Sequence, residues 1–105
     1  MNLEHYSLDK LGKEIAAIIR NHLDVSKYRV FFFGSRVTGK NTERSDIDIG
    51  IEGPIPVDVE TMMEIEEEID KLPTLYKIEI VDFVKVEPKF KQVAKQHIEY
   101  LKTDK

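Results

Sequence analysis

The sequence contains no cysteine, and only five glycines and four prolines occur among its 105 residues. The absence of cysteine excludes disulfide bonds, thiolate nucleophiles and cysteine-ligated zinc or iron–sulfur centres. No apolar run approaches the about 20 residues that a helix needs to cross a bilayer, and the charged, amphipathic N-terminal segment is unlike a secretion signal. We therefore expect no membrane association and a cytoplasmic location.

Basic residues are also in the minority. Lysine and arginine together number 16 against 20 acidic residues, so the formal net charge is −4 at pH 7. A broad nucleic-acid-binding surface needs an excess of positive charge and is therefore not expected. The net charge does not exclude a local basic patch. The length predicts a single domain over residues 1–105.

The spacing of the apolar residues predicts alternating helices and strands. Apolar residues recur at helical spacing after Ser7, which is suited to an N-cap, and again in two later segments. Three other segments are apolar throughout or alternate with the period of two that strands show. The predicted helices cover about 8–23, 58–72 and 88–101, and the predicted strands cover 28–33, 46–52 and 77–84. This order predicts an α/β (α+β) fold in which helices pack on a small mixed sheet.

Two aspartates carry the first candidate site. Asp46 and Asp48 are two residues apart on a predicted strand, so both carboxylates leave the same face, roughly 6–7 Å apart at about 3.3 Å per residue. Two like charges this close are costly unless a cation lies between them. Hard carboxylate oxygens suit Mg²⁺, which also binds substrate phosphates. The pair therefore indicates a magnesium site.

A third acid, Asp82, lies between the apolar residues Val81 and Phe83 on the last predicted strand. If this strand pairs beside the strand of Asp46 and Asp48, cross-strand neighbours lie roughly 5 Å apart. The three carboxylates would then converge on one metal cluster. The alternative is an acid that protects a sheet edge against aggregation.

The turn after the first predicted strand is suited to binding phosphate. Gly34 permits a tight turn and a close approach of backbone N–H groups to an anion, and Ser35 adds a hydroxyl donor. Arg36 and Arg44 supply positive charge in the same stretch. Taken singly, a Gly-Ser turn or an Asp-x-Asp pair is usually structural, but together on successive strands they indicate a nucleoside triphosphate site.

The spacing of these motifs resembles a known family. Gly34-Ser35, ten further residues and then Asp46-x-Asp48 has the arrangement of the nucleotidyltransferase signature in the DNA polymerase β-like superfamily. The longer string, GSRVTG followed by SDID, looks like the minimal nucleotidyltransferases (MNT), which are often paired with a HEPN-domain protein. The family often has a small residue and then arginine where this chain has Val37-Thr38, so one basic phosphate contact is missing or is supplied elsewhere.

The resemblance implies a polymerase β-like palm fold and assigns roles to individual residues. Gly34 and Ser35 would bind the triphosphate, with Arg36, Arg44 and Ser45 as further nucleotide contacts. The three acids, Asp46, Asp48 and Asp82, would be the catalytic residues and the ligands of two Mg²⁺ ions, and Asp82 would also help to deprotonate the attacking hydroxyl.

The resemblance also implies an activity. The chain would transfer AMP from ATP to a hydroxyl of a HEPN-domain partner, as the antitoxin of a HEPN/MNT toxin–antitoxin pair. One alternative is a non-catalytic, nucleotide-binding subunit that holds a HEPN protein in complex. Another is a transferase for a small molecule of the aminoglycoside kind. For the assembly of the chain, a homodimer is the alternative.

The second predicted helix has a strongly acidic side. Its acids are Glu64, Glu66, Glu67, Glu68 and Asp70. We expect an ordinary solvated helix surface there, with a binding surface for a basic partner as the alternative.

Overall fold

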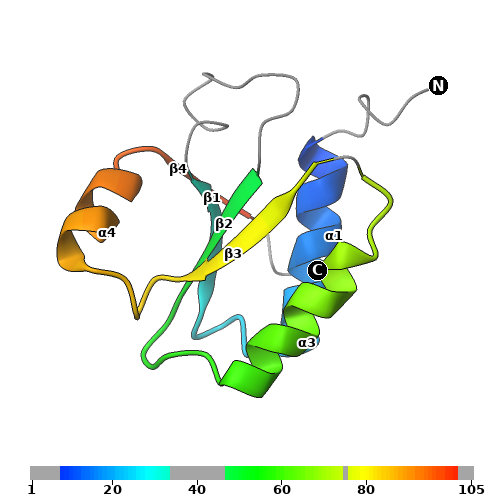
Figure 1. Cartoon of the computed structure of the whole chain (residues 1–105), viewed down its shortest axis with the longest axis horizontal. Coiled ribbons are helices and arrows are strands. Elements are labelled where there is room, and N and C mark those ends of the chain that lie inside the picture. Colours follow the sequence, from blue (N-terminus) through cyan, green and yellow to red (C-terminus); the bar gives the residue numbers. More distant parts are fainter. Residues whose placement is uncertain (1–7, 34–46, 75, 102–105) are drawn as a thin grey trace.

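A computed structural model describes residues 8–33, 47–74 and 76–101. The chain forms helices α1 (Leu8–Arg20), α3 (Val59–Asp70) and α4 (Pro88–Ala94) and strands β1 (Arg29–Phe33), β2 (Ile47–Glu52), β3 (Ile78–Asp82) and β4 (Ile98–Tyr100). The strands form one sheet in the order β3-β2-β1-β4, with α1 and α3 on one side and α4 on the other (Figure 1). None of the helices in these ranges is long and apolar enough to cross a membrane.

The sheet is mixed, as the sequence predicts. β1 runs antiparallel to both β2 and β4, whereas β3 runs parallel to β2. A parallel neighbour requires a crossover connection, and α3 lies in this connection. Asp58 begins α3 as its N-cap, because its side chain accepts a hydrogen bond from the Thr61 backbone N–H at 3.2 Å.

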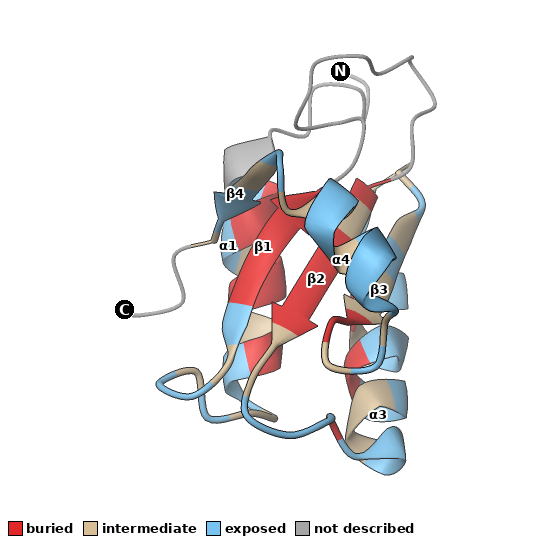
Figure 2. Cartoon of the chain, turned by 90° about the vertical axis from the view of Figure 1, so that its left-hand side faces the viewer, coloured by how far each residue is buried: buried red, intermediate tan, exposed pale blue. Residues whose placement is uncertain are grey.

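The main core lies between the sheet and the layer formed by α1 and α3. Ile47, Ile49 and Ile51 of β2 are fully buried in it, which confirms the predicted alternation along this strand. The same cluster contains Leu11, Ile15 and Ile19 of α1, Ile65 and Ile69 of α3, and Val30 and Phe32 of β1. Figure 2 shows the buried strands β1 and β2 at the centre of the molecule.

A second, smaller cluster covers the opposite face of the sheet. Phe31, Phe33 and Phe83 are buried there, and the Phe83 ring centroid lies 5.0 Å from that of Phe31 and 4.9 Å from that of Phe33. These rings meet edge to face, which aromatic pairs favour. Phe90 of α4 adds a ring 6.1 Å from Phe33. A side chain at Gly50 would overlap the Phe31 ring, so only glycine lets this ring lie so close to β2.

The last described segment differs from the predicted helix 88–101. α4 ends at Ala94, and residues 98–100 form β4 beside β1, with Tyr100 opposite Phe31. Without β4, the backbone groups of β1 would be unpaired along this edge. This non-local pairing outweighs the helical spacing of the apolar residues, so the helix prediction is wrong beyond α4.

Candidate active site

Most of the predicted phosphate-binding and metal-binding residues lie outside the described ranges. These are Gly34, Ser35, Arg36, Arg44, Ser45 and Asp46. The strands that flank them are described: the chain leaves β1 at Phe33 and enters β2 at Ile47. Phe33 is the register partner of Asp48, so the two flanking strand ends lie side by side at one end of the sheet.

Asp48 lies on the face of the sheet opposite to α1 and α3. It alternates with Ile47 and Ile49, which are fully buried under these helices, and its own side chain is half-buried. Its cross-strand partner Phe33 belongs to the aromatic cluster of the opposite face. Asp48 is therefore on the same face of the sheet as the aromatic cluster and α4 (Figure 1).

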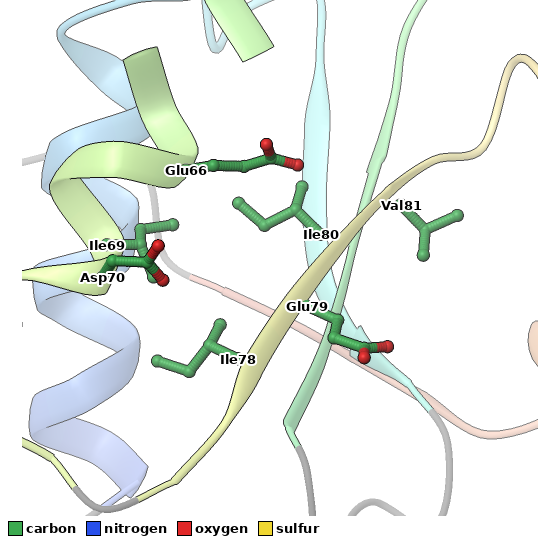
Figure 3. Close-up of a pocket in the computed structure, with 7 residues that line it drawn as sticks. All are labelled: Glu66, Ile69, Asp70, Ile78, Glu79, Ile80 and Val81. Carbon is green, nitrogen blue, oxygen red and sulfur yellow. The ribbon is translucent and has the colours of Figure 1, made fainter. Parts of the chain in front are cut away.

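Glu79 is the acid of β3 that lies beside Asp48. β2 and β3 pair in parallel with Asp48 opposite Glu79, and adjacent strands are about 4.8 Å apart. Figure 3 shows Glu79 pointing away from Ile78 and Ile80, which lie on the α3 side of β3. The Glu79 side chain is 50% exposed, and its carboxylate lies 3.7 Å from the Lys77 ammonium group. Asp48 and Glu79 therefore form an acidic pair on one face.

Asp82 has a different environment. Asp82 is the register partner of Ile51 on β2. It is three residues from Glu79, so the two acids lie on opposite faces of β3. Its side chain is 9% exposed, and its carboxylate oxygens accept hydrogen bonds from the Val57 N–H at 2.7 Å and the Val84 N–H at 3.0 Å. The prediction that Asp82 converges with Asp48 is therefore wrong, and its carboxylate instead ties the segment before α3 to the end of β3.

The sequence contains a signal for Glu79 that the prediction of Asp82 overlooked. Residues 78–80 repeat the apolar–acidic–apolar pattern of residues 47–49, as residues 81–83 around Asp82 also do, so the pattern makes both acids candidates. The apolar side chains of 47–49 and 78–80 pack in the helix-covered core, so the acids between them face the other way. Asp82 is an even number of residues from Ile78 and Ile80, so it lies on their face of β3 and not on the face of Glu79.

Glu52, at the far end of β2, holds α4 against the same face as Asp48. Its carboxylate oxygens lie 2.6 Å from the ammonium groups of Lys91 and Lys95. Burial raises the pKa of the Glu52 carboxyl, but the hydrogen bonds from the two lysines lower it by more, so the pKa lies below its ordinary value. Glu52 and Asp48 are four residues apart on β2, so they lie on the same face of the sheet. The two ion pairs therefore hold α4 on the face that carries the acidic pair.

Comparison with known proteins decides the family. Residues 13–105 match a family model described as polymerase beta, nucleotidyltransferase. The chain belongs to this nucleotidyltransferase family. The matched region includes both Asp48 and Glu79, so the acidic pair lies within the part that the family model covers.

Relatives of this nucleotidyltransferase occur among curated proteins and solved structures. The probable protein adenylyltransferase MntA of Haemophilus influenzae is 28% identical over 91 residues, 85% of this chain and 79% of that protein. A solved complex of tri-AMPylated HEPN toxin from Shewanella oneidensis with MNT antitoxin matches with a TM-score of 0.65 and 18% identity, over 92% of this chain and 74% of that chain. A toxin–antitoxin structure with AMP-PNP gives a TM-score of 0.68 and 20% identity, over 90% and 74%. These likenesses confirm the predicted polymerase β-like fold.

The acidic pair of this nucleotidyltransferase fits part of a magnesium site. Asp48 and Glu79 offer hard oxygen donors on one face, as Mg²⁺ requires. Among the described residues no group of three or more potential ligands is assembled. Asp46, the other predicted metal ligand of this segment, lies outside these residues.

Proposed function

We propose that this nucleotidyltransferase transfers AMP from ATP to a hydroxyl group of a partner protein. The observation that carries the proposal is the placement of Asp48 beside Glu79, on the face opposite to α1 and α3. Two further observations support the substrate class. The Haemophilus influenzae relative is named a probable protein adenylyltransferase, and one structural neighbour was solved with the ATP analogue AMP-PNP.

In this proposal, Asp46, Asp48 and Glu79 hold two Mg²⁺ ions. When bound, such ions neutralise the charge that develops on the phosphates and on the leaving group. The acceptor oxygen forms a bond to the α-phosphorus of ATP as the bond to pyrophosphate breaks. Glu79, which is half exposed, accepts the proton of the acceptor hydroxyl.

The residues between β1 and β2 bind the triphosphate in this proposal. Gly34 permits close approach of backbone N–H groups to phosphate oxygens, and the Ser35 hydroxyl donates to one of them. Arg36 and Arg44 neutralise phosphate charge, and Ser45, which precedes Asp46 in the sequence, adds a further hydroxyl. Phe33, which precedes this segment in the sequence, is the register partner of Asp48.

The partner in this proposal is a HEPN-domain protein, for which the chain acts as the antitoxin. Support comes from the structural neighbours, one of which is an MNT antitoxin in complex with a tri-AMPylated HEPN toxin. Modification of a toxin by AMP needs ATP, which is consistent with a reaction in the cytoplasm.

The test incubates the chain with a candidate HEPN-domain partner, Mg²⁺ and ATP labelled at the α-phosphate, and measures label transfer to that partner. We expect the partner to be labelled, Asp48→Asn to abolish labelling, and Glu67→Gln, an exposed position on α3, to leave it intact. Labelling that survives Asp48→Asn would overturn the proposed site. Binding of Mg²⁺–ATP by calorimetry without any transfer would instead support the non-catalytic, nucleotide-binding subunit.

A further inference from the structure

β3 is an edge strand in the described part of the chain. The Lys77 carbonyl accepts a hydrogen bond from β2 and the Phe83 N–H donates one to β2, both at 2.8 Å. In a parallel pair, alternate residues direct their backbone groups to the same neighbour, so every second residue from 77 to 83 faces β2. The N–H and C=O groups of Ile78 and Ile80 therefore point outwards, where no other described strand pairs with them.

A hollow of about 340 Å³ follows this edge between α3 and β3 (Figure 3). A second hollow of about 290 Å³ continues along α3 and shares Glu66 and Ile80 with the first. We call the two hollows together the α3–β3 groove. Ile69, Ile78 and Ile80 form apolar walls of the first hollow, so a side chain that enters it meets both apolar and polar surface.

One end of the α3–β3 groove is acidic. The charged residues that line the first hollow are Glu66, Asp70 and Glu79, and no lysine or arginine is among its lining residues. Glu66 and Asp70 lie one helical turn apart on α3 and point towards β3 (Figure 3). This end is therefore suited to a positively charged side chain.

The other end of the α3–β3 groove is apolar and exposed. Val59 and Met63 lie one turn apart on α3 at the second hollow, and they are 62% and 56% exposed. Lys85 also lines this hollow, as does Asp82, whose carboxylate already accepts two backbone hydrogen bonds. This end is suited to an apolar side chain.

We propose that the α3–β3 groove binds an extended segment of a partner protein, which adds to the free edge of β3 as a further strand. A lysine or arginine of the segment lies over Glu66 and Asp70, and an apolar residue packs on Val59 and Met63. Strand addition takes its affinity from the main chain and its specificity from such alternate side chains. A second copy fits poorly, because its own edge is net acidic and each copy has a net charge of −4.

This inference concerns binding alone and does not depend on AMP transfer, so it is tested without nucleotide. The probe is a fluorescein-labelled ten-residue peptide with threonine at every second position, so that the residues in between share one face of a strand. These residues are lysine in one half of the peptide and valine in the other, and binding is followed by fluorescence anisotropy. We expect at least tenfold weaker binding when glutamate replaces each lysine, and again when alternate amides are N-methylated. Hydrogen exchange then locates the peptide: it should slow exchange of the outward amides of Ile78 and Ile80 at least tenfold and leave that of Val81, which faces β2, unchanged.

Charge reversal on α3 supplies the matched variants. The double variant Glu66→Lys and Asp70→Lys should weaken peptide binding at least tenfold. The control is Glu60→Lys and Glu67→Lys, which changes the net charge equally at exposed α3 positions that line neither hollow. Circular dichroism checks that both proteins are folded.

Three results would overturn the proposal. The first is equal binding of the lysine and glutamate peptides, and the second is equal weakening by the two double variants. The third is protection of the Ile78 and Ile80 amides that rises with protein concentration in the absence of peptide, which would assign the groove to a second copy. None of these results would bear on the proposed transfer, whose test depends on Asp48 and nucleotide.

Discussion

Asp48 on β2 and Glu79 on β3 are register partners on the same face of the sheet. Strand spacing puts their backbones about 4.8 Å apart, so their negative charges repel unless a cation or a basic group lies nearby. Asp82, three residues beyond Glu79, faces the opposite side and binds backbone N–H groups. The two acids of β3 therefore have separate tasks: Glu79 belongs to the candidate site, whereas Asp82 stabilises the fold through its backbone hydrogen bonds.

Glu79→Gln tests the first task. We expect AMP transfer to fall by about 100-fold or more, equivalent to about 2.7 kcal/mol of transition-state stabilisation, because an amide cannot carry the charge that holds a cation. The free energy of unfolding should change by no more than about 0.5 kcal/mol, as for most surface substitutions, since the side chain is half exposed. Label transfer and urea unfolding measure the two effects, and an unchanged transfer rate would remove Glu79 from the site.

Asp82→Ala tests the second task. It leaves the Val57 N–H buried without its acceptor and removes the bond to Val84, so we expect a loss of about 2–4 kcal/mol in the free energy of unfolding. Asp58→Ala, which removes only the N-cap bond to Thr61, should cost about 1 kcal/mol. Urea unfolding compares them, and an equal or smaller loss for Asp82→Ala would contradict its structural role.

Gly50→Ala tests the close packing of Phe31 on β2. A methyl group at this position overlaps the Phe31 ring, so we expect a loss of about 1–3 kcal/mol from overpacking. Phe31→Leu creates a cavity by itself, yet it should reduce the cost of Gly50→Ala when the two are combined. A thermodynamic cycle from four urea titrations measures this coupling, and strictly additive losses would contradict the overlap.

The ion pairs of Glu52 predict a dependence of stability on pH. Because the folded protein lowers the pKa of this carboxyl, its contribution is fully present above the ordinary value of 4.5 and is lost as the pH falls through the lower folded pKa. Glu52→Gln should therefore flatten the decline of unfolding free energy below pH 4.5. Glu67→Gln, on the exposed side of α3, is the control, and an equal flattening by that variant would contradict the assignment.

Segments whose structure depends on local spacing were predictable. The first two helices and the first three strands occur close to their expected bounds. Apolar residues recur with the helical period in α1 and α3, alternate along β2 and occupy every position of 30–33 in β1. Residues 98–100 were not predictable in this way. Their apolar residues fit a helix locally, but pairing with β1 satisfies backbone groups that no local pattern reveals.

The same division holds for the candidate site. The sequence by itself determined that Asp48 faces away from Ile47 and Ile49, and that Glu79 and Asp82, three residues apart on one strand, face opposite sides, because side chains alternate with a period of two. Only the tertiary structure decided that Glu79, not Asp82, lies beside Asp48. This pairing follows from the register of the two parallel strands. The register depends on how α3, the helix that connects them, packs on the sheet and on which side chains fill the core.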